Sequence, residues 1–283
     1  MSWVQAKTDR AARRVAGAVW SPDGDGLIDR SVPEEIAVSL CLNGRPIAVV
    51  IASPGDYADL GLGFALTEGL VRRAEDVSGC VVTAKTAGVR VDVRLIPGAE
   101  GAPPRERALP GRSSCGLCGL TQLNDAVRRI RLVSPGGAMD PAILHAAFTD
   151  LDLHQPLNKE TRAVHAAAHV RPDGRFTEVR EDVGRHNALD KLIGALAQAG
   201  VDAADGAVLL TSRASYEMVD KAAAAGVRIL AAISAPSALA LRKAEAAGMT
   251  LVGVARRDSF VAFTGAERLG LSLPSREGEP ING

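Results

Sequence analysis

The chain has 283 residues, of which 47% are apolar and 23% are charged, and its 33 basic residues balance its 33 acidic ones. This composition is that of a folded protein of about two domains, and it excludes wholesale disorder. The zero net charge and the few aromatic residues (two Trp, two Tyr and five Phe) argue against a general nucleic-acid binder, which needs a basic groove and stacking platforms.

The sequence shows no segment that is typical of membrane spanning or export. No uninterrupted apolar run reaches about 18 residues, and residues 1–14 carry charges throughout without an apolar stretch. We therefore expect a cytoplasmic protein with no membrane partner. Its cysteines are too few for a disulfide scaffold and are expected to be reduced there; they are Cys41, Cys80, Cys115 and Cys118.

The first third of the chain mixes α and β patterns. Residues 1–30 are polar and weakly patterned, whereas residues 34–53 predict two short strands joined by a turn at Asn43-Gly44. Apolar residues within 59–70 fit a helix, and the alternation in residues 88–97 predicts a further strand. These elements indicate a small α+β unit.

A domain boundary is indicated by residues 97–111, which are dense in Pro, Gly and charge. This composition is typical of an exposed connection rather than of a packed element. We therefore expect a smaller α+β domain over residues 1–110 and a larger α/β domain over residues 111–283.

Beyond the boundary, predicted helices and strands alternate. Helices are predicted at residues 119–130, 187–198, 217–226 and 237–248, and strands at residues 175–182, 206–211, 227–234 and 249–255. The strands are nearly continuous in apolar residues and glycine stands at helix ends, which is typical of βαβ units on a sheet covered on both faces. The sequence therefore predicts a three-layer α/β domain.

The strongest chemical motif is SSCGLCG, residues 113–119, which places a Cys-x-x-Cys pair between the Pro/Gly-rich connection and a predicted helix. The dipole and free backbone amides of a helix N-terminus stabilise a thiolate, and flanking glycines let another molecule approach. We interpret Cys115 and Cys118 as an exposed, reactive sulfur pair.

Other interpretations of this pair stay open. It can be buried, it can supply half of a zinc site, or it can form a thioredoxin-like disulfide. Zinc needs about four ligands, and only one such pair occurs, with Cys41 and Cys80 standing alone. A thioredoxin-like role lacks the usual placement of the pair after the first strand of a βαβ unit.

A second constellation, REDVGRHNALDK at residues 180–191, crowds charged side chains at a strand-to-helix junction. Arg185, His186 and the first amides of the following helix are placed to hold an anion, and Asp182 is placed to orient a histidine or an arginine. The competing interpretation is a surface salt-bridge cluster that caps the helix.

The loops after the next three strands, residues 211–215, 234–237 and 256–259, carry hydroxyls or arginines. Ligands bind at the carboxyl ends of strands in open α/β sheets, and hydroxyls with helix N-termini suit phosphates. Ser215 and Ser237, each taken alone, are better explained as plain helix caps. Together the junction and the loops predict an anion-binding edge formed by Arg185, His186, Ser212, Arg213, Ser234 and Arg256.

His165 and His169 stand four residues apart in VHAAAHV, a spacing that places two metal ligands on one helix face. No third ligand is visible in the sequence, and a single histidine in an apolar segment is more often a satisfied core residue. We predict no permanently bound metal.

Several motifs of this chain occur together in one known family. They are Asn43-Gly44, SPGDYADLGLGFALTEGLV, SSCGLCG, HAAAHV, REDVGRHNALDKLIG, TSRASYEMVDKAAAAG, SAPSALA and MTLVGVARRDSFVAFTG. In this combination the chain resembles the FdhD family of formate dehydrogenase accessory sulfurtransferases over most of its length. It departs from the family pattern in two places: Arg162 and Ala163 replace a common Gly-Gly, and Asp258 stands in a stretch that usually has glycine.

The resemblance implies a sulfur relay. Cys115 matches the persulfide-bearing position of the family and Cys118 its partner, with a cysteine desulfurase as sulfur donor. The implied acceptor is the molybdenum bis(molybdopterin guanine dinucleotide) cofactor, which the formate dehydrogenase catalytic subunit requires. The stretch with which the family binds this cofactor corresponds to Val254, Ala255, Arg256, Arg257, Asp258 and Ser259.

The resemblance also implies a cytidine-deaminase-like fold for the larger domain and a homodimer. A different class of function stays open, namely a non-catalytic chaperone that binds the molybdenum cofactor and uses its cysteines for redox or structural purposes. A double cysteine variant separates the two hypotheses, because only the relay needs the thiols. A structural zinc protein is a third and weaker alternative.

Overall fold

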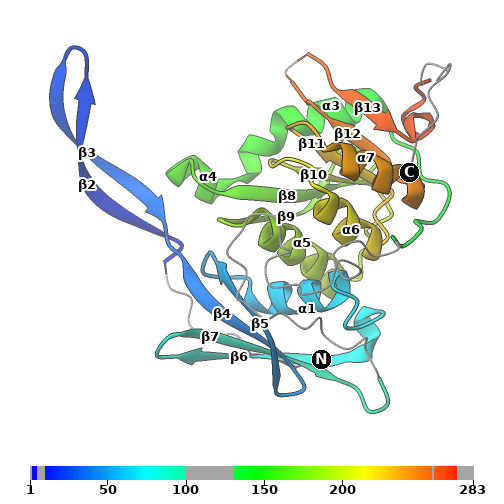
Figure 1. Cartoon of the computed structure of the whole chain (residues 1–283), viewed down its shortest axis with the longest axis horizontal. Coiled ribbons are helices and arrows are strands. Elements are labelled where there is room, and N and C mark those ends of the chain that lie inside the picture. Colours follow the sequence, from blue (N-terminus) through cyan, green and yellow to red (C-terminus); the bar gives the residue numbers. More distant parts are fainter. Residues whose placement is uncertain (1, 5–9, 100–129, 257, 273–283) are drawn as a thin grey trace.

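The structure is a computed structural model that describes residues 2–4, 10–99, 130–256 and 258–272. It has two main β-sheets with helices packed on them, which confirms the mixed α/β class (Figure 1). Within the described ranges, no helix is long and apolar enough to cross a membrane.

Among the described residues, the first sheet has five strands, and helix α1 packs on it. Its elements are β1 (Ser2–Val4), β4 (Ile36–Leu42), β5 (Arg45–Ala52), α1 (Tyr57–Thr67), β6 (Val77–Lys85) and β7 (Gly88–Leu95), with a 3-10 turn at Ala74–Asp76. The strand order is β1-β6-β7-β4-β5. The turn between β4 and β5 is formed by Asn43 and Gly44, which both have positive φ (48° and 84°), as the sequence predicts for an Asn-Gly hairpin.

The second sheet has six strands. Its elements are α3 (Pro141–Asp150), α4 (Pro156–Thr161), β8 (His165–Val170), β9 (Phe176–Asp182), α5 (Arg185–Ala199), β10 (Ala207–Leu210), α6 (Tyr216–Ala224), β11 (Ile229–Ala232), α7 (Ala238–Ala247), β12 (Thr250–Gly253) and β13 (Val261–Thr264), with 3-10 turns at Leu151–His154 and Ala266–Leu269. The strand order is β13-β12-β11-β10-β8-β9, and β10, β11 and β12 are parallel. Strand β8 is antiparallel to both β9 and β10, so β9 runs in the same direction as β10.

Buried side chains form a separate hydrophobic cluster on each face of the second sheet. On one face the strands pack against α5, α6 and α7, which contribute Leu189 and Met218 among others. On the other face they pack against α3 and the 3-10 turns, which contribute Leu144 and Leu269. Helical elements therefore cover both faces, because alternate residues of each strand point to opposite sides. The likeness to a deaminase fold stays a prediction.

Helix α1 lies between the first sheet and α5, and it joins the two halves of the molecule (Figure 1). The backbones of α1 and α5 touch where Gly63 meets Asp190 and where Gly194 meets Asp59. A Cβ atom at Gly63 would overlap the carbonyl oxygen of Asp190, and one at Gly194 would overlap that of Asp59. Glycine is therefore required at both positions of this crossing.

The predicted elements on both sides of the expected boundary occur in the structure, with small shifts at their ends. The helix predicted at 59–70, for example, begins at Tyr57 and ends at Thr67. The boundary near residue 110 and the helix predicted from residue 119 lie outside the described residues. The division into two domains therefore stays a prediction.

A long hairpin, which we call the arm, projects from the body of the molecule (Figure 1). It consists of β2 (Ala12–Ser21) paired with β3 (Gly24–Pro33), and among the described residues neither strand pairs with a third one. The weak patterning of residues 1–30 predicts no such element, which is a correction to the sequence interpretation. The missed signal is Pro22-Asp23-Gly24, a turn sequence between two stretches that contain β-branched residues.

Candidate functional site

Four strands of the second sheet, β9 to β12, point their carboxyl ends at the same edge. In open α/β sheets this is the edge at which ligands bind. The loops and helix start that follow these strands carry the predicted anion-site residues, namely Arg185, His186, Ser212, Arg213, Ser234, Val254, Ala255, Arg256, Asp258 and Ser259. Arg257 lies outside the described residues. The fold therefore gathers the predicted residues along one edge, and their binding role stays a prediction.

Helix α5 starts at this edge without a side-chain cap. Its N-cap residue is Gly184, and no acidic residue stands in its first turn. Helix α7 differs, because the hydroxyl of Ser237 accepts a hydrogen bond from the amide of Ala240 at 3.2 Å. Uncapped amides at the positive end of a helix dipole attract anions, and Arg185 and His186 are the first residues of α5.

A buried carboxylate holds His186. Its Nε2 atom lies 2.9 Å from Oε2 of Glu217, which stands in the first turn of α6 and is 9% exposed. The ring of His165, at the start of β8, lies within reach of the charges at the start of α5. Burial first, and then the positive charge of Arg185, lower the pKa of His165, while Asp182 raises it. At neutral pH His165 is therefore an uncharged imidazole beside a cationic helix start.

The loop after β12 is strained and tied to β11. Val254 has a φ of 54°, a left-handed conformation that β-branched residues rarely adopt and that is often found at functional sites. The amide of Arg256 donates to the carbonyl of Ser259 at 2.7 Å, which closes the loop. The guanidinium of Arg256 donates to the carbonyl of Ile233 at 3.0 Å, and the amide of Val254 donates to the carbonyl of Ser234 at 3.3 Å.

The other described residues of the edge are two serines, an arginine and an aspartate. Ser212 is buried and its hydroxyl donates to the carbonyl of Arg213 at 3.2 Å, while the Arg213 side chain is exposed. The carboxylate of Asp258 accepts a hydrogen bond from the Ser259 hydroxyl at 3.1 Å. The edge therefore offers cations and hydroxyls to an anion, with Asp258 as an opposing charge.

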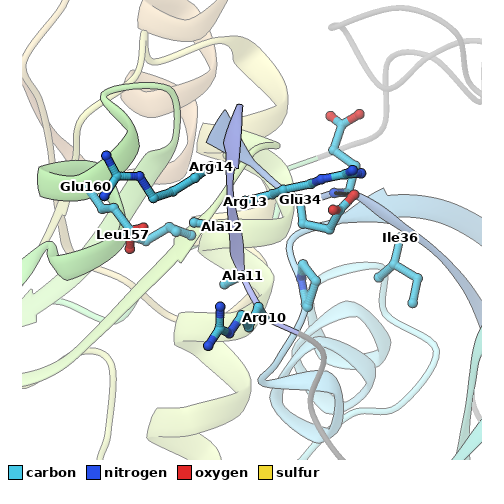
Figure 2. A pocket seen from close by; sticks show the side chains of 11 residues that line it. Arg10, Ala11, Ala12, Arg13, Arg14, Glu34, Ile36, Leu157 and Glu160 are labelled. Carbon is cyan, nitrogen blue, oxygen red and sulfur yellow. Dashed lines mark hydrogen bonds between the residues drawn. The ribbon is translucent and has the colours of Figure 1, made fainter. Parts of the chain in front are cut away.

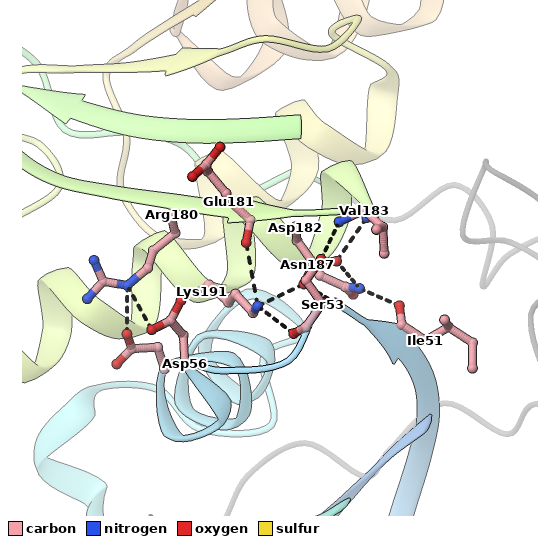
Figure 3. Close-up of polar contacts among 11 residues, drawn as sticks. Ile51, Ser53, Asp56, Arg180, Glu181, Asp182, Val183, Asn187 and Lys191 are labelled. Atoms are coloured by element: carbon pink, nitrogen blue, oxygen red, sulfur yellow. Dashed lines mark hydrogen bonds and ion pairs between the residues drawn. The ribbon is translucent and has the colours of Figure 1, made fainter. Parts of the chain in front are cut away.

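Asp182 does not orient a histidine or an arginine, so that part of the sequence interpretation is wrong. Its carboxylate is fully buried, and the donors around it occupy both oxygens (Figure 3). These donors are the backbone amides of Ser53 (2.9 Å) and Gly184 (2.8 Å), the amide side chain of Asn187 (2.9 Å) and the ammonium of Lys191 (2.8 Å).

The same network connects the first sheet to the start of α5. Ser53 follows β5, and its hydroxyl accepts a hydrogen bond from the amide of Val183 at 3.0 Å. Its carbonyl accepts one from the Lys191 ammonium at 3.0 Å, and the Asn187 side chain donates to the carbonyl of Ile51 at 2.7 Å (Figure 3). The turn that presents Arg185 is thus fixed by both halves of the molecule.

The histidine pair does not lie on a helix face, which corrects the sequence interpretation. His165 and His169 are both in strand β8, where four residues span about 13 Å, too far for two ligands of one metal. Within the described part of the chain, no group of three or more His, Cys, Asp or Glu side chains is placed to hold a metal. His169 is fully buried, and its Nδ1 atom lies 3.2 Å from the hydroxyl of Thr177.

Stability is expected to fall in mild acid because of His169. Burial, and then the charge of Arg171, lower the pKa of this histidine in the folded state. The unfolded chain therefore binds a proton more readily, so this contribution to stability is complete above a pH of about 6.5 and is lost as the pH falls through the folded pKa. His169→Gln should flatten the fall in the free energy of unfolding between about pH 7.5 and 5.5, measured by urea denaturation. Equal slopes in variant and wild type would contradict this account.

The cysteines divide into two groups. Cys115 and Cys118 lie outside the described residues, so their role stays a prediction. Cys41 and Cys80 are buried in the first sheet. Burial, with a further effect of the Asp92 charge, raises the pKa of Cys80 to about 12, so this residue is a protonated thiol at neutral pH.

Sequence reasoning missed two residues that shape the edge: Glu217 holds His186, and Ser53 supports the α5 turn. The hydroxyl of Thr211, in a loop that the sequence does predict, accepts a hydrogen bond from the amide of Ala166 at 2.8 Å, where β8 begins and β10 ends. Glu217 has a weak signal as an acidic residue at a helix start, whereas Ser53 has none, since its partner Asp182 is 129 residues away.

These features define an α/β protein whose sheet edge gathers cationic and hydroxyl side chains and whose sequence adds a separate Cys-x-x-Cys pair. Residues 33–270 match the model of the FdhD/NarQ family, and the chain belongs to this family, as its motifs predict. It is similar to proteins named sulfur carrier protein FdhD from Cupriavidus necator (49% identity over 212 residues, 75% of this chain and 74% of the relative) and Bordetella petrii (45% over 236 residues, 83% and 84%).

A solved structure is also similar over most of the chain. It is the crystal structure of a putative formate dehydrogenase accessory protein from Desulfotalea psychrophila, with a TM-score of 0.73 and 25% identity. The match covers 92% of this chain and 100% of that one. The mixed α/β architecture is therefore shared with that accessory protein.

Proposed function

We propose that this chain is a sulfur carrier that acts in the maturation of a formate dehydrogenase. The names of its relatives support the sulfur-carrier class, and the similar solved structure supports the link to formate dehydrogenase. Because Cys41 and Cys80 are buried, Cys115 and Cys118 are the cysteines left to do the chemistry.

The proposed loading step is a thiol exchange. The thiolate of Cys115 attacks the terminal sulfur of a persulfide on a cysteine desulfurase, so that a new S–S bond forms on Cys115 while the donor S–S bond breaks and the donor cysteine leaves as a thiolate. In the unloading step, the thiolate of Cys118 attacks Sγ of Cys115, which forms a disulfide and releases hydrosulfide. A dithiol reductant of the cell then restores the pair.

The proposed acceptor is a substrate with phosphate groups, the molybdenum bis(molybdopterin guanine dinucleotide). The observation that supports this choice is the uncapped start of α5 at the same sheet edge as several cationic side chains. Arg185 and His186, with Arg213 and Arg256 on the neighbouring loops, fit the phosphates of such a guest. The negative charge of Asp258 repels phosphate groups, so it limits where along the edge a phosphate can bind.

Sulfur loading tests the carrier hypothesis directly. Wild-type protein incubated with a cysteine desulfurase and free cysteine should gain one sulfur atom in intact-protein mass spectrometry. Cys115→Ala should gain none, whereas the matched variant Cys80→Ala should load like the wild type because Cys80 is buried and protonated. An unmodified wild type, or loading of Cys115→Ala, would refute the proposal.

A non-catalytic cofactor chaperone is the second candidate, favoured by one observation: apart from Arg257, the residues of the predicted binding edge stand in the described loops and helix start after β9, β10, β11 and β12, far in the sequence from Cys115 and Cys118. A double variant, Cys115→Ala with Cys118→Ala, separates the two. The carrier account expects at least a ~100-fold loss of formate dehydrogenase activity in cells that depend on this chain, by analogy with loss of an essential nucleophile. Full activity of the double variant would favour the chaperone.

A further inference from the structure

The hydrogen bond between His186 and Glu217 decides what this histidine can offer to an anion. Nε2 of His186 lies 2.9 Å from Oε2 of Glu217, and the two side chains are 22% and 11% exposed. An ionised carboxylate has no hydrogen to donate, so Nε2 carries the proton of this hydrogen bond. A guest that bonds to the ring therefore does so at the other nitrogen, Nδ1.

The Nδ1 atom has two chemical forms. In a neutral ring whose proton is on Nε2, Nδ1 is an acceptor, and its lone pair repels a phosphate oxygen. In a cationic ring, Nδ1 carries a hydrogen and donates a charge-assisted hydrogen bond to phosphate, which is among the stronger kinds. A phosphate can therefore bind to the ring of His186 only when the ring holds a second proton, which comes from the solvent.

Side chains from four elements face this second proton. Arg185, on α5, disfavours it by its own positive charge. His165, on β8, is uncharged at neutral pH because burial, and then Arg185, lower its pKa. Asp182, at the end of β9, already accepts hydrogen bonds from four donors of its own. Glu217, in the first turn of α6, is thus the carboxylate that can balance a cationic His186.

A groove of about 1010 Å³ at the base of the arm is the competing place for a nucleotide (Figure 2). Its described lining residues carry three positive and three negative charges; they are Arg10, Arg13, Arg14, Glu34, Glu35 and Glu160. This balance does not favour phosphates, whereas the start of α5 combines uncapped amides with Arg185 and His186. The sheet edge is therefore the better place for the phosphates.

We propose that Glu217 is a positioning residue of the nucleotide site: it holds the ring of His186 and balances the second proton that the ring takes up when a phosphate binds at Nδ1. Each binding event moves one proton from the solvent to the ring. Glu217 does not touch the nucleotide and acts on it through His186. This inference rests on the proposed function, because it takes the nucleotide of the acceptor to bind at the sheet edge.

Proton uptake on binding tests the inference. Calorimetric titration with guanosine diphosphate at pH 8, in buffers that differ in ionisation enthalpy, gives the number of protons taken up per nucleotide. The wild type should take up roughly one proton, because histidine is ordinarily neutral and phosphate is ionised at this pH. Glu217→Gln keeps an acceptor for Nε2 but removes the negative charge. Its proton uptake should fall toward zero, and the nucleotide should bind ~10-fold more weakly.

A double-variant cycle separates positioning from a merely structural role. His186→Gln should abolish the proton uptake, and adding Glu217→Gln to it should not weaken binding further, because the ring through which Glu217 acts is gone. The matched control is Glu267→Gln, an exposed acidic residue in the first turn of Ala266–Leu269, which follows β13 at the opposite edge of the sheet. This control should bind the nucleotide and take up a proton like the wild type.

The outcomes distinguish this inference from the proposed function. Nucleotide binding by the wild type without proton uptake would overturn the inference and leave the proposed function standing. An equal loss of affinity from Glu217→Gln with and without the histidine would do the same, since Glu217 would then act on the fold of α6. A wild type that binds no guanosine diphosphate would contradict both the inference and the proposed acceptor site.

Discussion

Gly63→Ala is expected to destabilise the protein by about 3 kcal/mol, among the largest effects of any single methyl group in this fold. The added Cβ would overlap the backbone carbonyl oxygen of Asp190, and a backbone atom cannot turn aside as a flexible side chain can. The helices α1 and α5 would have to separate along the crossing that joins the two sheets. The melting temperature should fall by roughly 5 °C.

Gly17→Ala is the matched control for this prediction. A Cβ there meets only the side chain of Ile28, at an ordinary 3.6 Å, so the melting temperature should change by less than about 2 °C. Gly194→Ala, on the other side of the crossing, should behave like Gly63→Ala. Wild-type stability of either crossing variant would mean that the two helices are not in backbone contact.

Lys191→Met is expected to cost about 3–5 kcal/mol, because it leaves the carboxylate of Asp182 buried without its cation. Both side chains of this pair are essentially unexposed. Asp182→Asn with Lys191→Met should recover part of the loss, since the double variant no longer contains an unpaired buried charge. Urea denaturation of the two single variants and the double variant gives the coupling energy.

An ion pair on the surface provides the comparison for these variants of the buried pair. Arg14 and Asp29 are joined at 2.7 Å, as close as Lys191 and Asp182, but their side chains are 71% and 55% exposed. Asp29→Asn should therefore cost less than about 1 kcal/mol. If Lys191→Met and Asp29→Asn lowered the free energy of unfolding equally, water would have access to the Asp182–Lys191 pair.

The sequence predicts the β9–α5 junction and the strand-end loops well, because glycines mark the ends of the elements and the chemistry is local. It misses the partner of Asp182, since Ser53 lies on another sheet and no local pattern points to it. In the segment VHAAAHV, packing within the sheet overrides the local preference for a helix. Alanine favours helices, but between β9 and β10 the small side chains of this segment form a buried strand.

The arm shows a different limit of sequence reasoning. A strand in the body of a protein alternates apolar and polar residues because one face is buried, whereas both faces of the arm are open in a single chain. The usual pattern is therefore absent, and the Pro22-Asp23-Gly24 turn is the remaining local cue.

The central claim is that Cys115 carries the sulfur, whereas a guanine nucleotide binds at the sheet edge and does not need Cys115 for binding. Sulfur loading by mass spectrometry and binding of guanosine diphosphate by calorimetry, measured on the same preparations, test it most directly. The account predicts that Cys115→Ala binds the nucleotide like the wild type but takes no sulfur. It predicts that Arg185→Ala takes sulfur normally but binds the nucleotide at least ~10-fold more weakly. The claim would be contradicted if either variant lost both sulfur loading and nucleotide binding. It would also be contradicted if both variants kept both properties.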